Sequence, residues 1–326
     1  MDDTLHDSHL PELLDGLIDL TAQRERRHLQ LTLLTTLRDL LPGATVSLYN
    51  CRWIDGRPWW RPLADRDDAE LAPWRLPGAA LLPIIEQKLP RQDCYQMDTG
   101  VCVPLYHQGQ VIGVLLVNMV DDSEPDTRLL TALARIHENF LGLLHVSDSD
   151  ELTGLGNRRL FDQHLFRALS QAPQRGRRCF LALLDIDHFK QVNDRYGHLI
   201  GDEVLLMLGQ YMQRHFGPED GLYRYGGEEF ALLLLARDGE QALSQLEAFC
   251  RSLASSHFPQ VPQVTASIGL AALEGCRMPS EALERADKAL YYAKQHGRNQ
   301  ACTYETLEAQ GLVSVVQAPS SDIDLF

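Results

Sequence analysis

The sequence predicts an α+β protein in which two domains are joined by a helix. A chain of 326 residues is long enough to bury about two hydrophobic cores of ordinary size. In its second half, strand-like and helix-like stretches alternate in the order βααββαβ, with a hairpin between the second and third strands. Because a hairpin makes its two strands antiparallel, this order favours a ferredoxin-like or palm-type sheet over a doubly wound parallel one.

The first half is predicted to begin with helix and to continue with strands. Apolar residues recur at helical spacing over residues 10–41, and the Pro-Gly pair at 42–43 ends this pattern. Strand-like stretches follow at ATVSLYN, GVCVPLYH and QVIGVLLVNM, the last two separated by a short polar turn. All four tryptophans lie in this half. They could line a ligand cavity, although packing in the core is the more common role of such side chains.

A helix predicted from about residue 124 links the two halves. Some of its apolar residues step by four, three, four and three, which places them on one face. They are Leu129, Leu133, Ile136, Phe140 and Leu143. A stripe of about two heptads is more typical of an intramolecular core than of a coiled coil. Its position between two domains also allows a parallel contact between two copies of the chain.

The predicted elements of the second half follow one another closely. They are a strand at 179–187, helices from about 188 and over about 200–216, a hairpin of 222–225 and 230–235, a helix at 239–255, a strand at 263–273, a helix at 280–296 and a strand at 299–305. Gly226 and Gly227 are expected to form a two-residue turn, because glycine adopts a positive φ without steric cost. In an antiparallel sheet of this order, the end of the first strand and the tip of the hairpin can lie side by side.

The composition argues against several partners and locations. A net charge of −15 disfavours nonspecific binding to nucleic acid or anionic lipid, which both attract a basic surface. The longest apolar run, at 111–120, is about half of a membrane span, and the acidic N-terminus lacks a basic region, so neither membrane insertion nor export is expected. Seven scattered cysteines without a CxxC pair favour a reducing cytoplasm over a disulfide framework or zinc site, with a redox pair of Cys94 and Cys102 as the alternative.

Acidic residues follow both the first predicted strand of the second half and the Gly-Gly turn. Asp185 and Asp187 are two residues apart and therefore share a face at the end of a buried strand. Carboxylates in such a place are costly unless they pair with a cation, so Asp185, Glu228 and Glu229 form a candidate site for Mg²⁺ or Mn²⁺. Taken alone, the two glutamates could equally lie in a solvated turn. Asp187 is expected to cap the following helix.

The segment VCVPLYHQGQVIGVLLV resembles the late strands of GAF sensor domains, in which an apolar strand with Pro-Leu, a turn and an Ile-Gly-Val-Leu strand follow one another. The resemblance implies a GAF-like α/β sensor domain at about residues 23–145, preceded by an N-terminal segment at 1–22. A PAS-like module fits the same order of elements. The ligand or signal of this domain is not indicated by the sequence.

Five segments of the second half share their order and spacing with a known family of enzymes. They are DELTGLGNRRLF (150–161), DIDHFKQVND (185–194), YGHLIGDEVL (196–205), RYGGEEF (224–230) and ADKALYYAKQHGRN (286–299). They resemble the GGDEF family of diguanylate cyclases, which condense two GTP into cyclic di-GMP with release of pyrophosphate. The resemblance implies a nucleotidyl cyclase fold over residues 146–306, followed by a tail at 307–326.

The resemblance implies a metal site with a catalytic role. Asp185, the backbone carbonyl of Ile186, Glu228 and Glu229 would hold one or two divalent ions, Mg²⁺ or Mn²⁺. Glu228 would also assist deprotonation of the ribose 3′-hydroxyl. When bound, the metal lowers the pKa of that hydroxyl and neutralises charge developing on the α-phosphate, so no protein nucleophile is needed.

The resemblance also implies contacts to the triphosphate of GTP. Lys190, Lys294 and Arg298 would contact the β- and γ-phosphates, while the glycines of the turn, Gly226 and Gly227, let a ligand approach the backbone. Lys294 and Arg298 are four residues apart near the end of a predicted helix, so they are expected to share a face. Taken alone, these two cations could be explained by the helix dipole.

Two further residues would read the base. The resemblance assigns Asn193 and Asp202 to guanine. A carboxylate can accept hydrogen bonds from both N1–H and the 2-amino group of guanine, and adenine has no donors at those positions. Asp202 therefore implies GTP over ATP, although an acid near a helix start could also be a cap or be solvated.

One position departs from the family pattern. Many members carry an RxxD inhibitory site that binds the product, with its Asp five residues before the Gly-Gly pair. Here Asp220 is retained but Gly217 stands in the place of the Arg. Because a bidentate guanidinium is lost, product inhibition through this site is expected to be weak or absent.

The reaction implied by the resemblance needs two copies of the domain. Each copy holds one GTP, and each 3′-hydroxyl must attack the α-phosphate of the other nucleotide, so a homodimer through the GGDEF domains is expected, with the N-terminal half contributing to it. An alternative is a catalytically inactive GGDEF module that binds GTP or a partner protein as a regulator. The metal, phosphate and base-reading residues are all present, which favours the active enzyme.

Overall fold

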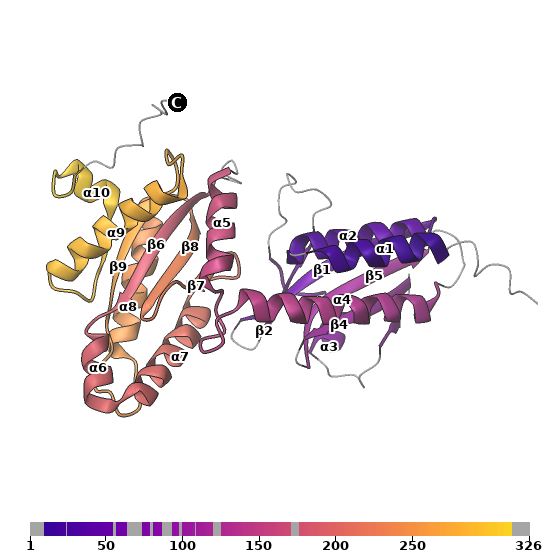
Figure 1. Cartoon of the computed structure of the whole chain (residues 1–326), viewed down its shortest axis with the longest axis horizontal. Helices are drawn as coiled ribbons and strands as arrows, with labels where there is room; N and C mark the ends of the chain where they lie inside the picture. Colours follow the sequence, from indigo (N-terminus) through magenta and orange to yellow (C-terminus); the bar gives the residue numbers. More distant parts are fainter. Residues whose placement is uncertain are drawn as a thin grey trace, which may run out of the picture. The chain divides into compact units, whose positions relative to one another are not determined.

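Each half of the chain is built around its own five-stranded sheet (Figure 1). The computed structural model describes residues 10–23, 25–54, 57–63, 74–78, 81–86, 93–97, 100–107, 109–119, 125–170 and 176–314. The chain divides into an N-terminal unit, Met1–Ser147, and a C-terminal unit, Asp148–Phe326. Within the described residues, no helix is both long enough and apolar enough to cross a membrane.

The N-terminal unit is an antiparallel sheet with helices on its faces. Its elements are α1 (Leu10–Ala22), α2 (Arg26–Leu40), β1 (Ala44–Ile54), β2 (Arg57–Pro62), α3 (Leu82–Ile85), β3 (Tyr95–Met97), β4 (Gly100–His107), β5 (Gln110–Met119) and α4 (Thr127–Asp148). The strand order is β2-β1-β5-β4-β3, and every neighbouring pair is antiparallel. The predicted β4–β5 hairpin is confirmed. The predicted helix start near residue 124 lies outside the described residues; Asp126 accepts hydrogen bonds from the backbone N–H groups of residues 128 and 129.

Alternating side chains of this sheet pack against different partners. Leu48, Val103 and Leu115 face α2 and α4, whereas Cys51 and Cys102 belong to a second cluster with α3 on the other face. This alternation follows from the two-residue period of a strand. The tryptophans take part in local packing: the Trp53 indole N–H donates to the Val111 carbonyl at 2.9 Å, and Trp60 stacks on Tyr49 with ring centroids 4.5 Å apart.

Helix α4 buries most of its apolar face against the sheet of its own unit. Leu130, Leu133, Ala134 and Leu141 are almost completely buried in the core shared with α2. Of the stripe predicted from heptad spacing, Leu133 is in this core, but Leu143 at the far end is 67% exposed. The intramolecular interpretation of the stripe is therefore correct for Leu129, Leu133 and Phe140.

The elements of the C-terminal unit follow the predicted order, with one further helix at each end of the series that was not predicted. They are α5 (Arg158–Ser170), β6 (Arg178–Ile186), α6 (Phe189–Tyr196), α7 (His198–His215), β7 (Gly221–Arg224), β8 (Glu229–Ala236), α8 (Gly239–Ser255), β9 (Ala266–Ala272), α9 (Pro279–Gln295), β10 (Ala301–Thr303) and α10 (Tyr304–Ala309). The sheet order is β10-β9-β6-β8-β7; from β9 to β7 each strand is antiparallel to its neighbour, and β10 is parallel to β9. The antiparallel part has the order expected of a ferredoxin-like or palm-type sheet.

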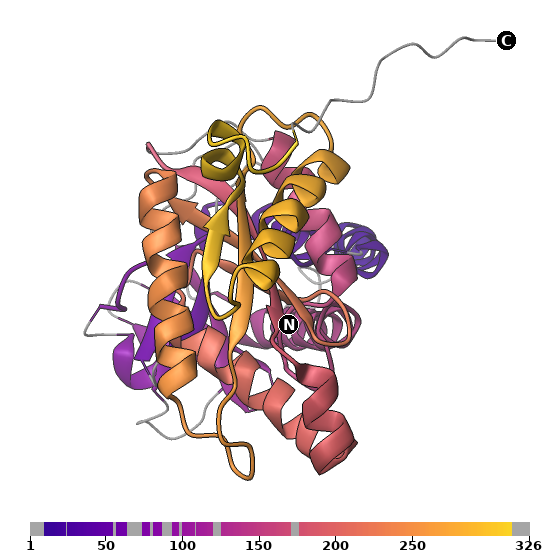
Figure 2. The ribbon, with the colours of Figure 1, turned by 90° about the vertical axis from the view of Figure 1, so that its left-hand side faces the viewer.

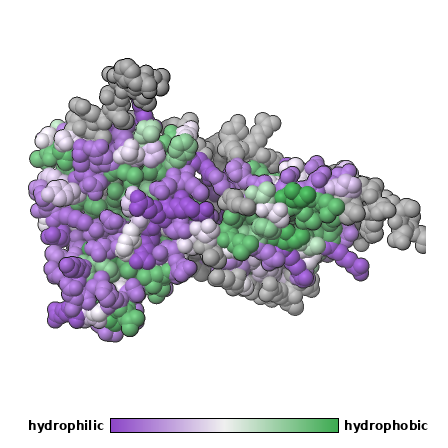
Figure 3. All heavy atoms as spheres, in the orientation of Figure 1, coloured by the Kyte–Doolittle hydropathy of each residue, from purple (hydrophilic) through white to green (hydrophobic). Residues whose placement is uncertain are grey.

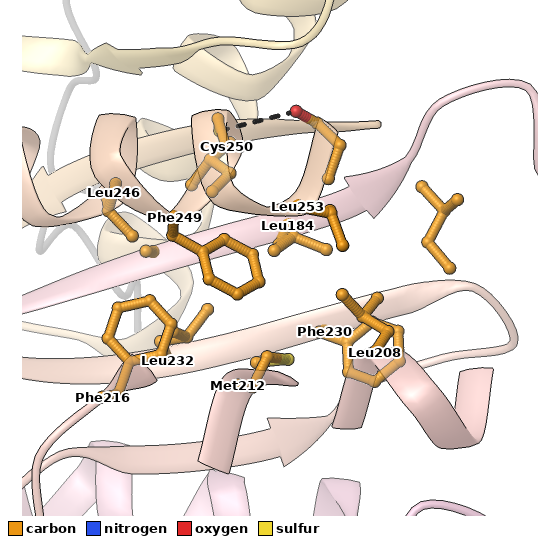
Figure 4. Packing of buried hydrophobic residues seen from close by; sticks show 14 of the residues in the cluster. Leu184, Leu208, Met212, Phe216, Phe230, Leu232, Leu246, Phe249, Cys250 and Leu253 are labelled. Atoms are coloured by element: carbon orange, nitrogen blue, oxygen red, sulfur yellow. Dashed lines mark hydrogen bonds between the residues drawn. The ribbon is translucent and has the colours of Figure 1, made fainter. Parts of the chain in front are cut away.

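Helices cover both faces of this sheet, with α8 and α9 on opposite sides (Figure 2). On one face, Leu184 and Phe230 meet Leu208 and Met212 of α7 and Phe249 of α8 in a continuous apolar core (Figure 4). On the other face, α5 and α9 cover β6, β8 and β9. At Gly269, a Cβ atom would overlap the backbone of α9 at Ala286 and Leu290. Glycine here lets α9 lie directly on β9, which fixes the height of α9 above the sheet.

Candidate active site

The end of β6 and the tip of the β7–β8 hairpin meet at one edge of the C-terminal sheet. Asp185 is the register partner of Glu229 across the antiparallel β6–β8 pair, so their side chains project from the same face. The Ile186 N–H donates to the Glu228 carbonyl at 3.4 Å. Four residues chosen from distant parts of the sequence therefore come together as predicted. Asp185 is only 7% exposed.

The turn that carries Glu228 is wider than predicted. β7 ends at Arg224 and β8 begins at Glu229, and the N–H groups of Tyr225 and Gly226 both donate to the Glu229 carbonyl, at 2.8 and 3.0 Å. Neither glycine of the turn has a positive φ, so the prediction of a two-residue turn was wrong. The reason for glycine at 226 is space: a Cβ atom there would overlap the folded side chain of Glu229.

Burial and like charge shift the titration of the two central carboxylates. The pKa of Asp185 is raised, mainly by burial, with Asp187 adding to the effect and Lys294 opposing it. The pKa of Glu228 is also raised, first by burial and then by Asp185, again against Lys294. The Lys294 ammonium lies 2.8 Å from Oδ2 of Asp185. The site is thus a pair of oxygen donors whose negative charges are compensated by one lysine.

The oxygen atoms of these carboxylates are of the chemical type that binds a hard divalent cation. Carboxylate and carbonyl oxygens are the ligands that Mg²⁺ and Mn²⁺ prefer, and a carboxylate whose pKa is raised by a neighbouring carboxylate, as Glu228 is by Asp185, is stabilised by a dication. Within the described residues, however, no three His, Cys, Asp or Glu side chains are arranged as a complete metal cluster. The ammonium of Lys294 is the cation that contacts Asp185 in this structure.

Asp187 has a different role from the one predicted. His188, with φ of 59°, stands at the N-cap position of α6, so the prediction that Asp187 caps this helix was wrong. Its carboxylate accepts hydrogen bonds from the hydroxyls of Thr265 and Ser267, both at 2.7 Å, and from the backbone N–H of Asn299 at 3.0 Å. Asp187 therefore joins the start of α6 to β9 and to the loop after α9.

The expected phosphate contacts come from three different places. Lys190 is exposed on α6, and Lys294 lies in the last turn of α9. Because α9 ends at Gln295 and Arg298 adopts a left-handed φ of 59°, Lys294 and Arg298 do not share a helix face, which corrects the prediction. Arg298 instead belongs to the loop that Asp187 holds through Asn299.

The two expected base-reading residues lie on consecutive helices. Asn193 is in α6, and Asp202 is exposed in the first turns of α7. The side chain of Asn193 lies directly over Gly201, where an added Cβ atom would overlap its Oδ1 atom. The sequence analysis missed this role of Gly201, although the glycine is part of the segment YGHLIGDEVL.

Substituting Gly201 by alanine should raise the KM for GTP about tenfold or more with a smaller change in kcat. The added methyl group must push Asn193 away from its position, and a lost hydrogen bond from a buried polar group costs about 1–3 kcal/mol. Steady-state kinetics would measure this change. Gly239→Ala, at the start of α8 (Gly239–Ser255), is the control, because an added Cβ atom there makes only an ordinary contact with Phe180. Unchanged KM in Gly201→Ala would show that Asn193 does not contact the base.

Arg224 is a further residue that the sequence analysis did not single out. Its guanidinium donates to the Gly227 carbonyl through Nε and NH2, at 3.2 and 2.8 Å, and to both carboxylate oxygens of Asp150 at 3.2 Å. Burial pushes the pKa of Asp150 upward, but hydrogen bonds from Thr153 and the charge of Arg224 outweigh it and lower the pKa. Arg224 thus ties the hairpin tip to the beginning of the C-terminal unit.

Asp220 is already engaged within its own loop. Its carboxylate accepts hydrogen bonds from the N–H of Gly217 at 2.9 Å and of Leu235 at 3.2 Å. Gly217 brings no side chain to the place where a guanidinium was expected. Asp220 closes the turn between α7 and β7 and tethers it to β8.

The sheet and this edge define a class of protein: a palm-type α+β domain with clustered carboxylates and cations, as suits metal-assisted binding of a nucleotide triphosphate. Residues 147–300 match the family model described as "Diguanylate cyclase, GGDEF domain". The match to the GGDEF family therefore covers most of the C-terminal unit. The N-terminal unit lies outside the matched range.

Several characterised proteins are similar to this chain. Diguanylate cyclase DgcP of Pseudomonas aeruginosa is 35% identical over 198 residues, which cover 59% of this chain and 29% of DgcP. Diguanylate cyclase DgcM of Escherichia coli K12 is 39% identical over 178 residues, which cover 52% of this chain and 41% of DgcM. The coiled coil and GGDEF domain of DgcB from Caulobacter crescentus, solved with c-di-GMP, has 32% identity and a TM-score of 0.49, covering 54% of this chain and 97% of that one. The chain thus spans less than half the length of DgcP or DgcM.

Proposed function

We propose that this chain is a diguanylate cyclase that condenses two GTP into one cyclic di-GMP and two pyrophosphates. The observation that carries the proposal is the meeting of Asp185, Glu228 and Lys294 at the sheet edge of a GGDEF domain. The similarity to proteins named diguanylate cyclases supports the same conclusion.

The acidic residues of the site would bind the metal and accept the proton. Asp185, the Ile186 carbonyl, Glu228 and Glu229 would hold Mg²⁺ or Mn²⁺, which when bound neutralises negative charge developing on the α-phosphate. Glu228, whose pKa is raised by burial and by Asp185, is suited to accept the proton of the ribose 3′-hydroxyl. A carboxylate with a higher pKa is a stronger base.

The remaining residues bind and orient the substrate. Lys190, Lys294 and Arg298 would hold the β- and γ-phosphates beside the turn of Gly226 and Gly227, where the space next to Gly227 is open. Asn193 and Asp202 would select guanine by hydrogen bonding. In each half-reaction the 3′-oxygen forms a bond to the α-phosphorus of the other GTP, the bond between the α- and β-phosphates breaks, and pyrophosphate leaves with its electron pair.

The proposed reaction needs a homodimer, because two GTP must face one another. In the N-terminal unit, hydrophobic residues gather over α1 and α4 (Figure 3), and Leu14, Ile18 and Leu143 there are at least half exposed. This surface is suited to contribute to association of two copies. The GGDEF domains would then meet across the two-fold axis with symmetric active sites.

We further propose that residues 23–145 form a GAF-like sensor domain that regulates the cyclase. The β4–β5 hairpin in a five-stranded antiparallel sheet supports a small sensor module, with a PAS-like module as the alternative. The ligand is unknown, and the domain could act through dimerisation alone. All seven cysteines are free thiols, which supports a cytoplasmic location as part of the same proposal.

A direct assay tests the proposed activity. Purified full-length protein incubated with GTP and Mg²⁺ should yield cyclic di-GMP and two equivalents of pyrophosphate, with ATP not used. Absence of product from protein that still binds GTP normally would contradict the cyclase and support a GTP-binding regulatory module instead.

Product inhibition should be weak. Gly217 supplies no guanidinium, and the carboxylate of Asp220 is bonded to the backbone at Gly217 and Leu235. Adding cyclic di-GMP at about 10 µM, a concentration at which a 1 µM site would be mostly filled, should therefore leave the initial rate unchanged. Inhibition at this concentration that disappears in Asp220→Ala would contradict this expectation.

A further inference from the structure

Lys294 forms the closest cationic contact of the carboxylate site. Its Nζ atom lies 2.8 Å from Oδ2 of Asp185, whose side chain is 10% exposed, while the lysine side chain is 34% exposed. The backbone of α9 that carries this lysine is held against β9 at Gly269. The helix is therefore fixed, and the ammonium can change partners only by rotation of its own long side chain.

An ammonium and a divalent ion cannot both sit on Asp185 without a large repulsion. Mg²⁺ or Mn²⁺ binds carboxylate oxygens at about 2.0–2.2 Å, so a metal on Asp185 would lie about 4 Å from an ammonium on its other oxygen. At that separation the repulsion between a divalent ion and the ammonium exceeds the thermal energy several-fold, even when the protein screens it strongly. One of the two cations must leave.

We propose that Lys294 is the resident counter-ion of Asp185 and excludes the divalent metal until the phosphates of GTP draw the ammonium away. This inference rests on the proposed function. The anionic triphosphate binds the Lys294 ammonium. The negative charges of Asp185 and Glu228 are then uncompensated, and these carboxylates bind the metal. The metal therefore binds strongly only together with the nucleotide, and the two affinities are coupled in both directions. Lys294 acts here as a positioning residue for the metal as well as a phosphate contact.

Titration of the nucleotide-free, full-length protein with Mn²⁺, followed by the electron paramagnetic resonance signal of free Mn²⁺, tests the proposal. Lys294→Met should bind Mn²⁺ at least about tenfold more tightly than the wild type, because the competing charge is gone. Lys288→Met is the matched control: it removes a lysine of the same helix whose ion pair is with Glu284, and it should leave the affinities for Mn²⁺ and GTP unchanged. Lys294→Met should bind GTP more weakly than the wild type.

Two more variants keep the result interpretable. Lys294→Gln should show the same gain and replaces Lys294→Met if that variant does not fold. Adding Asp185→Asn to Lys294→Met should remove the gain, because the metal loses its carboxylate. Unchanged or weaker Mn²⁺ binding after loss of Lys294, or a gain that survives Asp185→Asn, would overturn the proposal. A wild type that makes no cyclic di-GMP, with a gain in Mn²⁺ affinity in Lys294→Met, would refute the proposed function alone.

Discussion

Replacing Glu228 by glutamine should lower kcat for cyclic di-GMP formation about 10²–10⁴-fold, with a smaller loss of GTP affinity. Glutamine keeps the size and hydrogen-bonding capacity of the side chain but cannot accept the proton of the 3′-hydroxyl or balance a metal ion. The pKa of Glu228 is raised by burial and by Asp185, which makes its carboxylate a stronger base than that of an ordinary glutamate. Initial rates at saturating GTP, with GTP affinity measured separately, would check the prediction.

A matched control separates this effect from a general effect of losing a carboxylate. Glu240 lies exposed in the first turn of α8, on the face of the sheet opposite to α9, and Glu240→Gln should keep the wild-type rate. A Glu228→Gln enzyme within tenfold of the wild type would mean that this glutamate neither accepts the proton nor helps to hold the metal.

A buried histidine should make the N-terminal unit sensitive to acid. His137 of α4 is 0% exposed, and within the described residues neither ring nitrogen has a hydrogen-bond partner. Burial, with a smaller contribution from the positive charge of Arg26, lowers the pKa of His137 from 6.5 to about 3. The neutral imidazole is therefore the form that the folded unit accepts.

The sign of the effect follows from proton binding. Below about pH 6.5 the unfolded chain takes up a proton at His137 and the folded unit does not, so the free energy of unfolding falls by about 1.4 kcal/mol per pH unit until about pH 3. Between pH 7 and pH 4.5 the loss should reach about 3 kcal/mol. The His137→Leu variant should not show this loss of stability between pH 7 and pH 4.5, because it places an apolar side chain of similar reach in the core.

Urea unfolding followed by tryptophan fluorescence would measure this difference, because all four tryptophans lie in the N-terminal unit. The free energies of unfolding of wild type and variant are compared at each pH, so that the contributions of carboxylates that titrate in both proteins cancel. His28→Leu, at an exposed position of α2, is the control and should keep the wild-type pH dependence. Equal acid destabilisation of wild type and His137→Leu would contradict the prediction.

The sequence by itself determined the order of elements and the type of sheet in the C-terminal unit. Apolar periodicity, the Gly-Gly turn and the acidic residues at strand ends are local signals, and local signals specify local structure. Once the sheet was expected to be antiparallel, the approach of Asp185 to the hairpin followed from its topology. The five segments that resemble the GGDEF family needed no tertiary information to be recognised as parts of one kind of site.

Only the tertiary structure decided which partners the polar side chains choose. Asp187 bonds to Thr265, Ser267 and Asn299, about a hundred residues away in sequence, and this long-range network replaced the helix cap that local pattern favours. A carboxylate at a strand end has several satisfactory partners within reach, and no local rule ranks them.

The same reason explains Arg224 on Asp150, Lys294 on Asp185 and the packing of Asn193 over Gly201. Each contact joins elements whose relative position depends on the packing of the whole sheet and its helices. Periodicity in the sequence states which face of an element is buried, but the distance between two charged atoms is set by side-chain volumes throughout the core. That is why the chemistry of the site was readable from the chain, while its electrostatic balance was decided by the fold.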